Sequence, residues 1–147
     1  MPTFRRILHP SDFSPASRPA FRKAVDLAKA GRASLFIAHV LPILPILPDA
    51  YVAATTYDEL MRSQRAVAKK HLDRLVAQAR KAGARASGVL VDFGVPAERI
   101  ARLARAKRAD VIVMGTHGRT GIKRVVLGSV AGRVLAIAPC PVLTVRA

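Results

Sequence analysis

The chain has 147 residues, of which 51% are hydrophobic and 23% are charged. This composition is typical of one globular domain spanning residues 1–147 and excludes a disordered chain. Because no apolar run approaches about 20 residues and no secretion signal opens the chain, we expect a cytoplasmic protein without a membrane span.

The net charge of +16 reflects 25 Lys and Arg residues against 9 Asp and Glu residues. The basic residues are scattered through Ala-rich segments, mainly residues 62–81 and 99–108. Spread charge favours a solvated surface with non-specific, salt-sensitive adsorption over specific nucleic-acid binding. With no Trp and only two Tyr, the chain also has few aromatic platforms on which bases could stack.

The first third of the chain predicts a strand, a helix and a second strand. Arg5–Pro10 is a short apolar strand that ends in polar residues. Ser14 followed by Pro15 has the pattern of an N-cap before a first helical proline, which predicts a helix over residues 15–30 with Gly31 as its stop. Ser34–Val40 is almost continuously apolar, as a strand buried on both faces would be.

The segment Leu41–Thr56 is apolar and rich in proline. Three prolines in close succession exclude a helix and a central strand, so an extended loop is expected. A lid beside a pocket, a contact with a partner subunit and a packed surface loop remain alternatives for it.

Helices and strands continue to alternate in the rest of the chain. A long helix is predicted over Tyr57–Ala82, with Gly83 as its stop. The apolar residues expected to face the core from this helix are Leu60, Val67, Leu72, Leu75, Val76 and Ala79.

A weaker strand, Ser87–Asp92, comes next, and a third helix opens at Gly94-Val95-Pro96 with Ile100, Leu103 and Ala104 inward. The strand Asp110–Met114, a helix that ends at Ala138 and the strand Val142–Val145 complete the series.

This alternation predicts an α/β fold with three α/β/α layers, in which four helices cover a doubly wound sheet of five parallel strands. Ligands of such sheets bind at the carboxyl ends of the strands, where the strand order reverses. The loops after Pro10, Val40 and Met114 are therefore the candidate binding loops.

A glycine-rich segment joins the fourth strand to the fourth helix. Gly115, Gly118 and Gly128 are followed by Ser129, a predicted N-cap of the helix. Glycine lets backbone amides approach a ligand closely, and a helix start offers unpaired N–H groups, so this order predicts a phosphate cradle. Arg119, Lys123 and Arg124 add positive charge, although a solvated basic loop would look the same. The spacing is neither that of a P-loop nor that of the dinucleotide fingerprint.

Three motifs together resemble the ATP-binding branch of the universal stress protein family. They are Ile7-Leu8-x-Pro10-x-Asp12-Phe13-Ser14, Gly115-x2-Gly118-x9-Gly128-Ser129 and Ala138-Pro139-Cys140-Pro141-Val142. The resemblance covers nearly the whole chain. It implies strand order 3-2-1-4-5, ATP as the ligand, Mg²⁺ or Mn²⁺ held mainly by the phosphates, and a homodimer formed through the edge strand Val142–Val145.

The resemblance also implies the residues of the nucleotide site. Adenine and ribose would be bordered by Pro10, Ser11, Asp12 and Val40, and the ribose would lie on Met114 and Gly115. The phosphates would be held by Gly118, Arg119, Gly128, Ser129 and Val130, while His117 either points at the nucleotide or fills the loop.

Three side chains keep two interpretations each. Asp12 faces the ribose, the adenine amino group or a phosphate-bound cation, or else bonds its own turn. His9 lies near the ligand or is a satisfied histidine at a strand end. Cys140 fits a small buried thiol better than a nucleophile.

The function expected from these features is that of a nucleotide-responsive regulator of stress tolerance. Slow ATP hydrolysis at the same site is the alternative, with Asp12 and His117 as the only nearby candidates and without a Walker lysine. A basic nucleic-acid-binding protein is a further alternative, which a salt titration would test. The pattern does not predict a dedicated enzyme.

Overall fold

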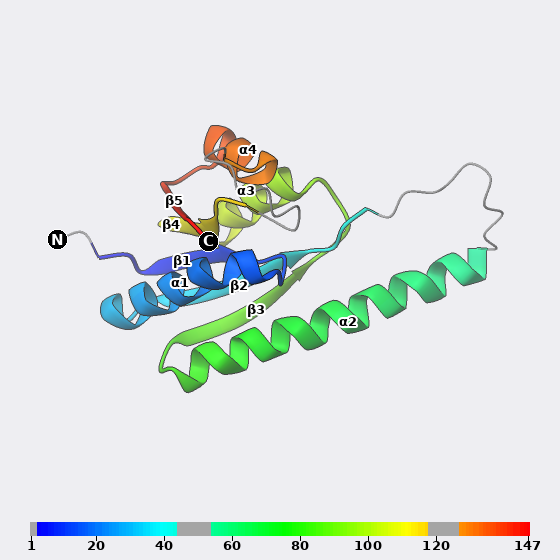
Figure 1. The fold of residues 1–147 in the computed structure, drawn as a ribbon, viewed down its shortest axis with the longest axis horizontal. Coiled ribbons are helices and arrows are strands. Elements are labelled where there is room, and N and C mark those ends of the chain that lie inside the picture. The colour runs from blue at the N-terminus through cyan, green and yellow to red at the C-terminus, as the bar shows by residue number, and fades with distance from the viewer. Residues whose placement is uncertain (1–2, 44–53, 118–126) are drawn as a thin grey trace.

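The computed structural model describes residues 3–43, 54–117 and 127–147. A five-stranded parallel sheet forms its centre, with the strand order β3-β2-β1-β4-β5 (Figure 1). The strands are β1 Arg6–Pro10, β2 Ser34–Val40, β3 Arg85–Val91, β4 Val111–Gly115 and β5 Val142–Val145. The predicted fold class and strand order are confirmed, and β5 lies at an edge of the sheet as expected.

Helices cover both faces of the sheet (Figure 1). The helices are α1 Arg18–Gly31, α2 Ala54–Lys81, α3 Pro96–Lys107 and α4 Ser129–Ile137. One core cluster joins α1 and α2 to the sheet, and a second joins α3 and α4 to its other face. Consecutive β1 residues alternate between them, because Ile7 enters the first cluster and Leu8 the second. Both are fully buried, as expected for a central parallel strand.

The start of the first helix differs from the prediction. Residues Pro15–Ser17 form a separate 3-10 turn, η1, and α1 begins only at Arg18. The Ser14 side chain makes no capping bond, because its hydroxyl donates instead to Asp12 at 2.6 Å. The Ser-Pro pattern therefore marks a turn that belongs to the loop after β1 rather than the N-terminus of the helix.

The first half of α2 also corrects the prediction. The helix begins at Ala54, inside the segment expected to be a loop, and most of that segment lies outside the described residues. Leu60 and Val67 were expected in the core, but they are 44% and 53% exposed. Their neighbours Met61 and Ala68 are half-buried and buried, so the covered face of α2 includes those two residues, and the rotation of about 100° per residue turns Leu60 and Val67 away from it.

The second half of α2 packs as predicted. Leu72 and Val76 are buried against β3 at Gly88, where an added Cβ would lie 3.1 Å from the Leu72 side chain. A glycine at this position therefore lets the helix approach the strand closely. Although α2 has 28 residues, it is not apolar enough to cross a membrane, and neither is any other helix in the described part of the chain.

Candidate nucleotide site at the carboxyl end of the sheet

A cavity of about 290 Å³ opens at the carboxyl ends of β1, β2 and β4, next to the start of α4. β1 pairs with β2 on one side and with β4 on the other, so the strand order reverses here. All ten predicted site residues that the structure describes line this cavity: Pro10, Ser11, Asp12, Val40, Met114, Gly115, His117, Gly128, Ser129 and Val130. The other two, Gly118 and Arg119, lie outside the described residues, as do Lys123 and Arg124.

The loop after β1 holds Asp12 in a fixed position. The Asp12 Oδ1 atom accepts hydrogen bonds from the Ser14 amide at 2.9 Å and from the Ser14 hydroxyl at 2.6 Å. The turn-forming interpretation of Asp12 is therefore correct, and the same residue also lines the cavity. Its two proposed roles are compatible, because the bonds to Ser14 orient the carboxylate at the rim of the cavity.

Phe13 closes this loop in a strained conformation. Its φ of 64° lies in the left-handed region, which costs a residue with a Cβ on the order of 1 kcal/mol. Ring contacts hold it, since its centroid lies 4.2 Å from that of His39 and 5.2 Å from that of His71. His39 also donates from Nδ1 to the Ser11 carbonyl at 2.8 Å. The loop that borders the cavity is thus tied to both β2 and α2.

The N-terminus of α4 points into the cavity. Gly128, not the predicted Ser129, is the N-cap, and Ser129 is the first helical residue. The first bond inside the helix runs from the Gly132 amide to the Gly128 carbonyl at 2.9 Å. The amides of residues 129–131 consequently have no acceptor earlier in the helix and can bind an anion.

Position 128 requires glycine because the Thr116 carbonyl lies too close for a side chain. Its amide donates to the Thr116 carbonyl at 2.6 Å, and an added Cβ would lie 2.8 Å from the same oxygen. This bond joins the end of β4 to the start of α4. Glycine is therefore needed here for close backbone approach, as the cradle motif predicts.

The remaining wall of the cavity is mainly apolar. Its lining residues that sequence reasoning did not assign to the site are Ser17, His39, Pro42, Pro96, Ile100, Thr116 and Ala131. Pro96 and Ile100 lie one turn apart on α3, and the sequence predicted Pro96 only as part of the helix start and Ile100 only as a core residue. His39 precedes Val40 at the end of β2, so its place at a strand's carboxyl end was the available signal.

His9 is fully buried and does not line the cavity. Its Nδ1 donates to the Val113 carbonyl at 2.8 Å, whereas its Nε2 has no partner among the described residues. His9 therefore lies near a strand end, as one interpretation predicted, but only one of its two ring nitrogens has a hydrogen-bond partner among the described residues. Burial lowers the pKa of His9 to about 4, against smaller opposing effects of the Val113 carbonyl and Asp12, so the ring is neutral.

The other groups with possible chemistry are less buried. The His117 Nδ1 atom lies 2.9 Å from the Thr116 hydroxyl, at the end of the described part of the loop. Cys140, expected to be buried, is half-buried, and burial raises the pKa of its thiol, which disfavours the reactive thiolate. Within residues 3–43, 54–117 and 127–147, no three His, Cys, Asp or Glu side chains are grouped so that they could hold a metal ion.

Known proteins are similar to this chain in sequence and in fold. The model of the universal stress protein family matches residues 3–146. The universal stress protein MJ0531 of Methanocaldococcus jannaschii is 35% identical over 144 residues, which are 97% of this chain and 82% of the relative. The universal stress protein UspA from Lactobacillus plantarum has a TM-score of 0.82 and 27% identity, covering 99% of this chain and 100% of that one. A universal stress protein in complex with cAMP has a TM-score of 0.72 and 28% identity, covering 99% of both chains. The chain belongs to the universal stress protein family.

Proposed function

We propose that the chain is an ATP-binding universal stress protein, a cytoplasmic one-domain regulator of stress tolerance that responds to nucleotide occupancy. One observation carries this proposal: a mainly apolar cavity ends at the start of α4, whose first amides have no acceptor within the helix, beside Asp12. That combination suits a ligand with an aromatic base at one end and phosphates at the other. The bound cAMP of a structural relative supports the adenine nucleotide class.

The parts of the nucleotide match different walls of the cavity. Val40 and Ile100 offer an apolar bed for adenine, Met114 lies where the ribose would rest, and Ser11 and Asp12 offer polar groups to the ribose. At about 290 Å³ the cavity lies at the small end of ligand pockets, which span about 300–1,000 Å³. It therefore suits the nucleoside, while the phosphates extend along the start of α4. Mg²⁺ or Mn²⁺ would be held mainly by those phosphates, and Gly118 and Arg119 would add phosphate contacts by resemblance to the family.

Binding is favoured over hydrolysis as the main activity. Asp12, the nearest carboxylate, already accepts two hydrogen bonds from Ser14 through Oδ1, which fixes it in the loop. The His117 ring bonds to its neighbour Thr116. Radiolabelled ATP with the parent protein and with Asp12→Ala would reveal slow turnover that belongs to this site.

A thermal shift measurement tests nucleotide binding. ATP with Mg²⁺ at about 100 times its Kd stabilises a protein by about 2.7 kcal/mol, which for a chain of this size raises Tm by roughly 5–10 °C. Ser129→Asp should abolish this rise, since its carboxylate would repel the phosphates while it still favours the helix N-terminus. Ser129→Asn has the same shape without the charge and should keep most of the rise. An unchanged Tm of the parent protein with millimolar ATP would contradict the proposal.

We also propose that the protein forms a symmetric homodimer through β5. This strand is short, lies at the edge of the sheet and exposes 39% of Leu143. Light scattering at micromolar concentration should give the mass of two chains, and Leu143→Lys should shift it to one. A monomer mass for the parent protein under these conditions would exclude this assembly.

A further inference from the structure

Basic side chains gather at the amino ends of the strands, the end of the sheet opposite the cavity. The amino-end basic face consists of seven exposed residues: Arg5, Arg6, Lys29, Arg32, Lys81, Arg85 and Arg108. Strands and helices both contribute to it. Strand register places Arg6 and Arg85 on either side of Ser34, at the first positions of β1, β3 and β2. Arg5 directly precedes β1, and the remaining four residues lie in or directly after the last turns of α1, α2 and α3.

Backbone and side-chain contacts join these residues into one continuous face. The Arg85 side chain donates to the Arg32 carbonyl, and the Ser34 amide donates to the Arg5 carbonyl at 2.8 Å. On the other side, the Asp110 amide donates to the Arg6 carbonyl at 2.8 Å. The face therefore runs along the sheet from the start of β3 to the start of β4.

The negative charges at this end are too few to neutralise the face. The C-termini of four helices each contribute about half a negative charge. Asp110 adds one more, and its Oδ2 accepts the amides of Arg5 and Arg6 at 2.8 Å each. Against these, roughly three negative charges in all, stand seven cations. The seven positive charges therefore outnumber the negative charge that the helix C-termini and Asp110 provide at this end.

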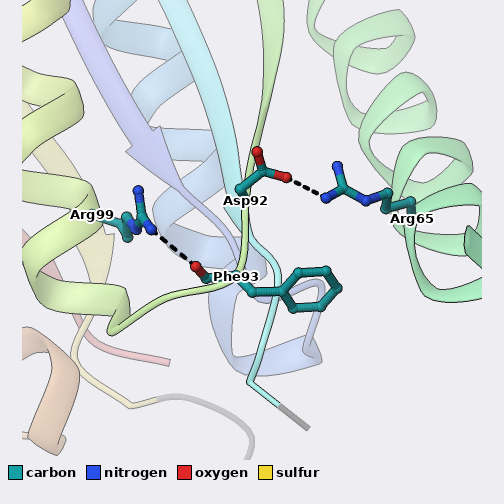
Figure 2. A network of polar contacts seen from close by, with 4 residues as sticks. All are labelled: Arg65, Asp92, Phe93 and Arg99. Atoms are coloured by element: carbon teal, nitrogen blue, oxygen red, sulfur yellow. Dashed lines mark hydrogen bonds and ion pairs between the residues drawn. The ribbon is translucent and has the colours of Figure 1, made fainter. Parts of the chain in front are cut away.

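The ion pairs of the described residues lie elsewhere. Arg65 bonds Asp92 at 2.6 Å after β3, Lys69 bonds Asp73 on α2, and Arg133 bonds Glu98 at the start of α3. Figure 2 shows the first of these beside Phe93, whose carbonyl accepts a bond from Arg99 at 3.0 Å. Two of these pairs thus join arginines to acidic residues near the carboxyl end, and no residue of the amino-end basic face takes part in any of the three.

We propose that the amino-end basic face binds the sugar–phosphate backbone of duplex nucleic acid without reading its sequence. Four adjacent strands span about 14 Å at about 4.8 Å per strand, and phosphates recur every 3.4 Å along one strand of a duplex. About four phosphates therefore match the length of the face. Five of its seven residues are arginines, whose planar groups can donate two bonds to one phosphate.

The surroundings of the face favour a duplex over other polyanions. Among the described residues, the large exposed apolar side chains lie on α2, α4 and β5, and two more are Ile43 and Val95. None of them lies between the amino ends of β3 and β4. A lipid surface is bound more firmly when apolar side chains insert into it, and single strands need aromatic rings for stacking. On this part of the described surface no large apolar or aromatic side chain is strongly exposed, and Phe4, next to Arg5, is half-buried against the first core cluster.

Fluorescence anisotropy with a labelled 20-base-pair DNA duplex tests the proposal. Four phosphate contacts predict a slope of log K against log salt of about −3.6, or a loss of affinity on the order of 100-fold between 50 and 200 mM salt. Arg6→Gln, Arg32→Gln and Arg85→Gln combined should make this slope shallower by about 3. The control combines Arg62→Gln, Lys70→Gln and Arg74→Gln on α2, removes the same charge from exposed and unpaired positions, and should change the slope little.

Three results would overturn the proposal. They are no binding by the parent protein at 50 mM salt, equal losses in the two triple variants, and tighter binding to phosphatidylserine vesicles than to the duplex. The second would show an effect of net charge alone, and the third would identify a lipid surface as the partner. Melting curves of both variants show whether each is folded, so a loss of binding can be assigned to the face.

Discussion

At the scale of single residues, His9 is the group most sensitive to pH. Its ring is fully buried, bonds the Val113 carbonyl of β4, and has its centroid 5.9 Å from that of Phe21. Protonation would put a charge into this apolar layer, where Nε2 has no partner among the described residues. The folded state therefore takes up the proton only near pH 4, whereas the unfolded chain takes it up near pH 6.5.

The free energy of unfolding should therefore fall as the pH falls from 6.5 to 4. Over this window the unfolded state binds more protons than the folded state, so His9 alone removes on the order of 3 kcal/mol by pH 4. Above pH 6.5 its contribution is constant. Urea unfolding at several pH values measures the effect. His9→Asn keeps a donor for the Val113 carbonyl but does not titrate, and its curve should be flatter. Equal slopes for the two proteins would show that other groups cause the loss.

At the scale of elements, two glycines at the start of α4 should respond oppositely to a methyl group. Gly128→Ala places a Cβ 2.8 Å from the Thr116 carbonyl, which should cost about 1–3 kcal/mol of stability. Gly132→Ala meets only the Leu127 side chain at 3.7 Å and should stabilise the helix by about 0.5–1 kcal/mol. Chemical denaturation of both variants measures the difference. The same sign for both changes would mean that the close approach at Gly128 is not required.

The two halves of α2 should differ as strongly. Leu72→Ala empties a site that is only 3% exposed and should cost about 2–5 kcal/mol. Leu60→Ala changes a residue that is 44% exposed beyond the sheet and should stay within about 0.5 kcal/mol. Urea unfolding compares them. Comparable losses would indicate that something covers the first half of the helix in solution.

This helix also shows where prediction from sequence ends. At about 100° per residue, Leu60 and Val67 do not share a face with Leu72 and Val76, and the small Ala68 continues the buried face instead, so choosing the large apolar residues identified the wrong face in the first half of the helix. Which face of the helix is covered depends on where the sheet lies beside it, which no local pattern encodes. The two predicted N-caps were also wrong because of neighbouring residues. The Ser14 hydroxyl bonds to Asp12 instead of capping a helix, and Gly128 rather than Ser129 is the N-cap of α4.

At the scale of the whole molecule, the strand order and the place of the site were predictable. Continuous apolar strands indicated a sheet covered on both faces, and the family motifs supplied its order. They also brought Asp12 and Gly128 to one cavity, although more than 100 residues separate them in sequence. The apolar wall from α3 was not predicted, since Ile100 serves the core and the cavity at once. The apolar periodicity of a helix cannot tell a side chain that packs in the core from one that lines a cavity.

The common direction of the strands has one more consequence. Strands of five to seven residues hold the cavity and the amino-end basic face about 17–23 Å apart. At physiological salt the screening length is about 8 Å, so charge at one end has little influence on an anion at the other. A small nucleotide and a long polyanion would therefore not compete, and a molecule resting on nucleic acid would keep its nucleotide cavity open to solvent.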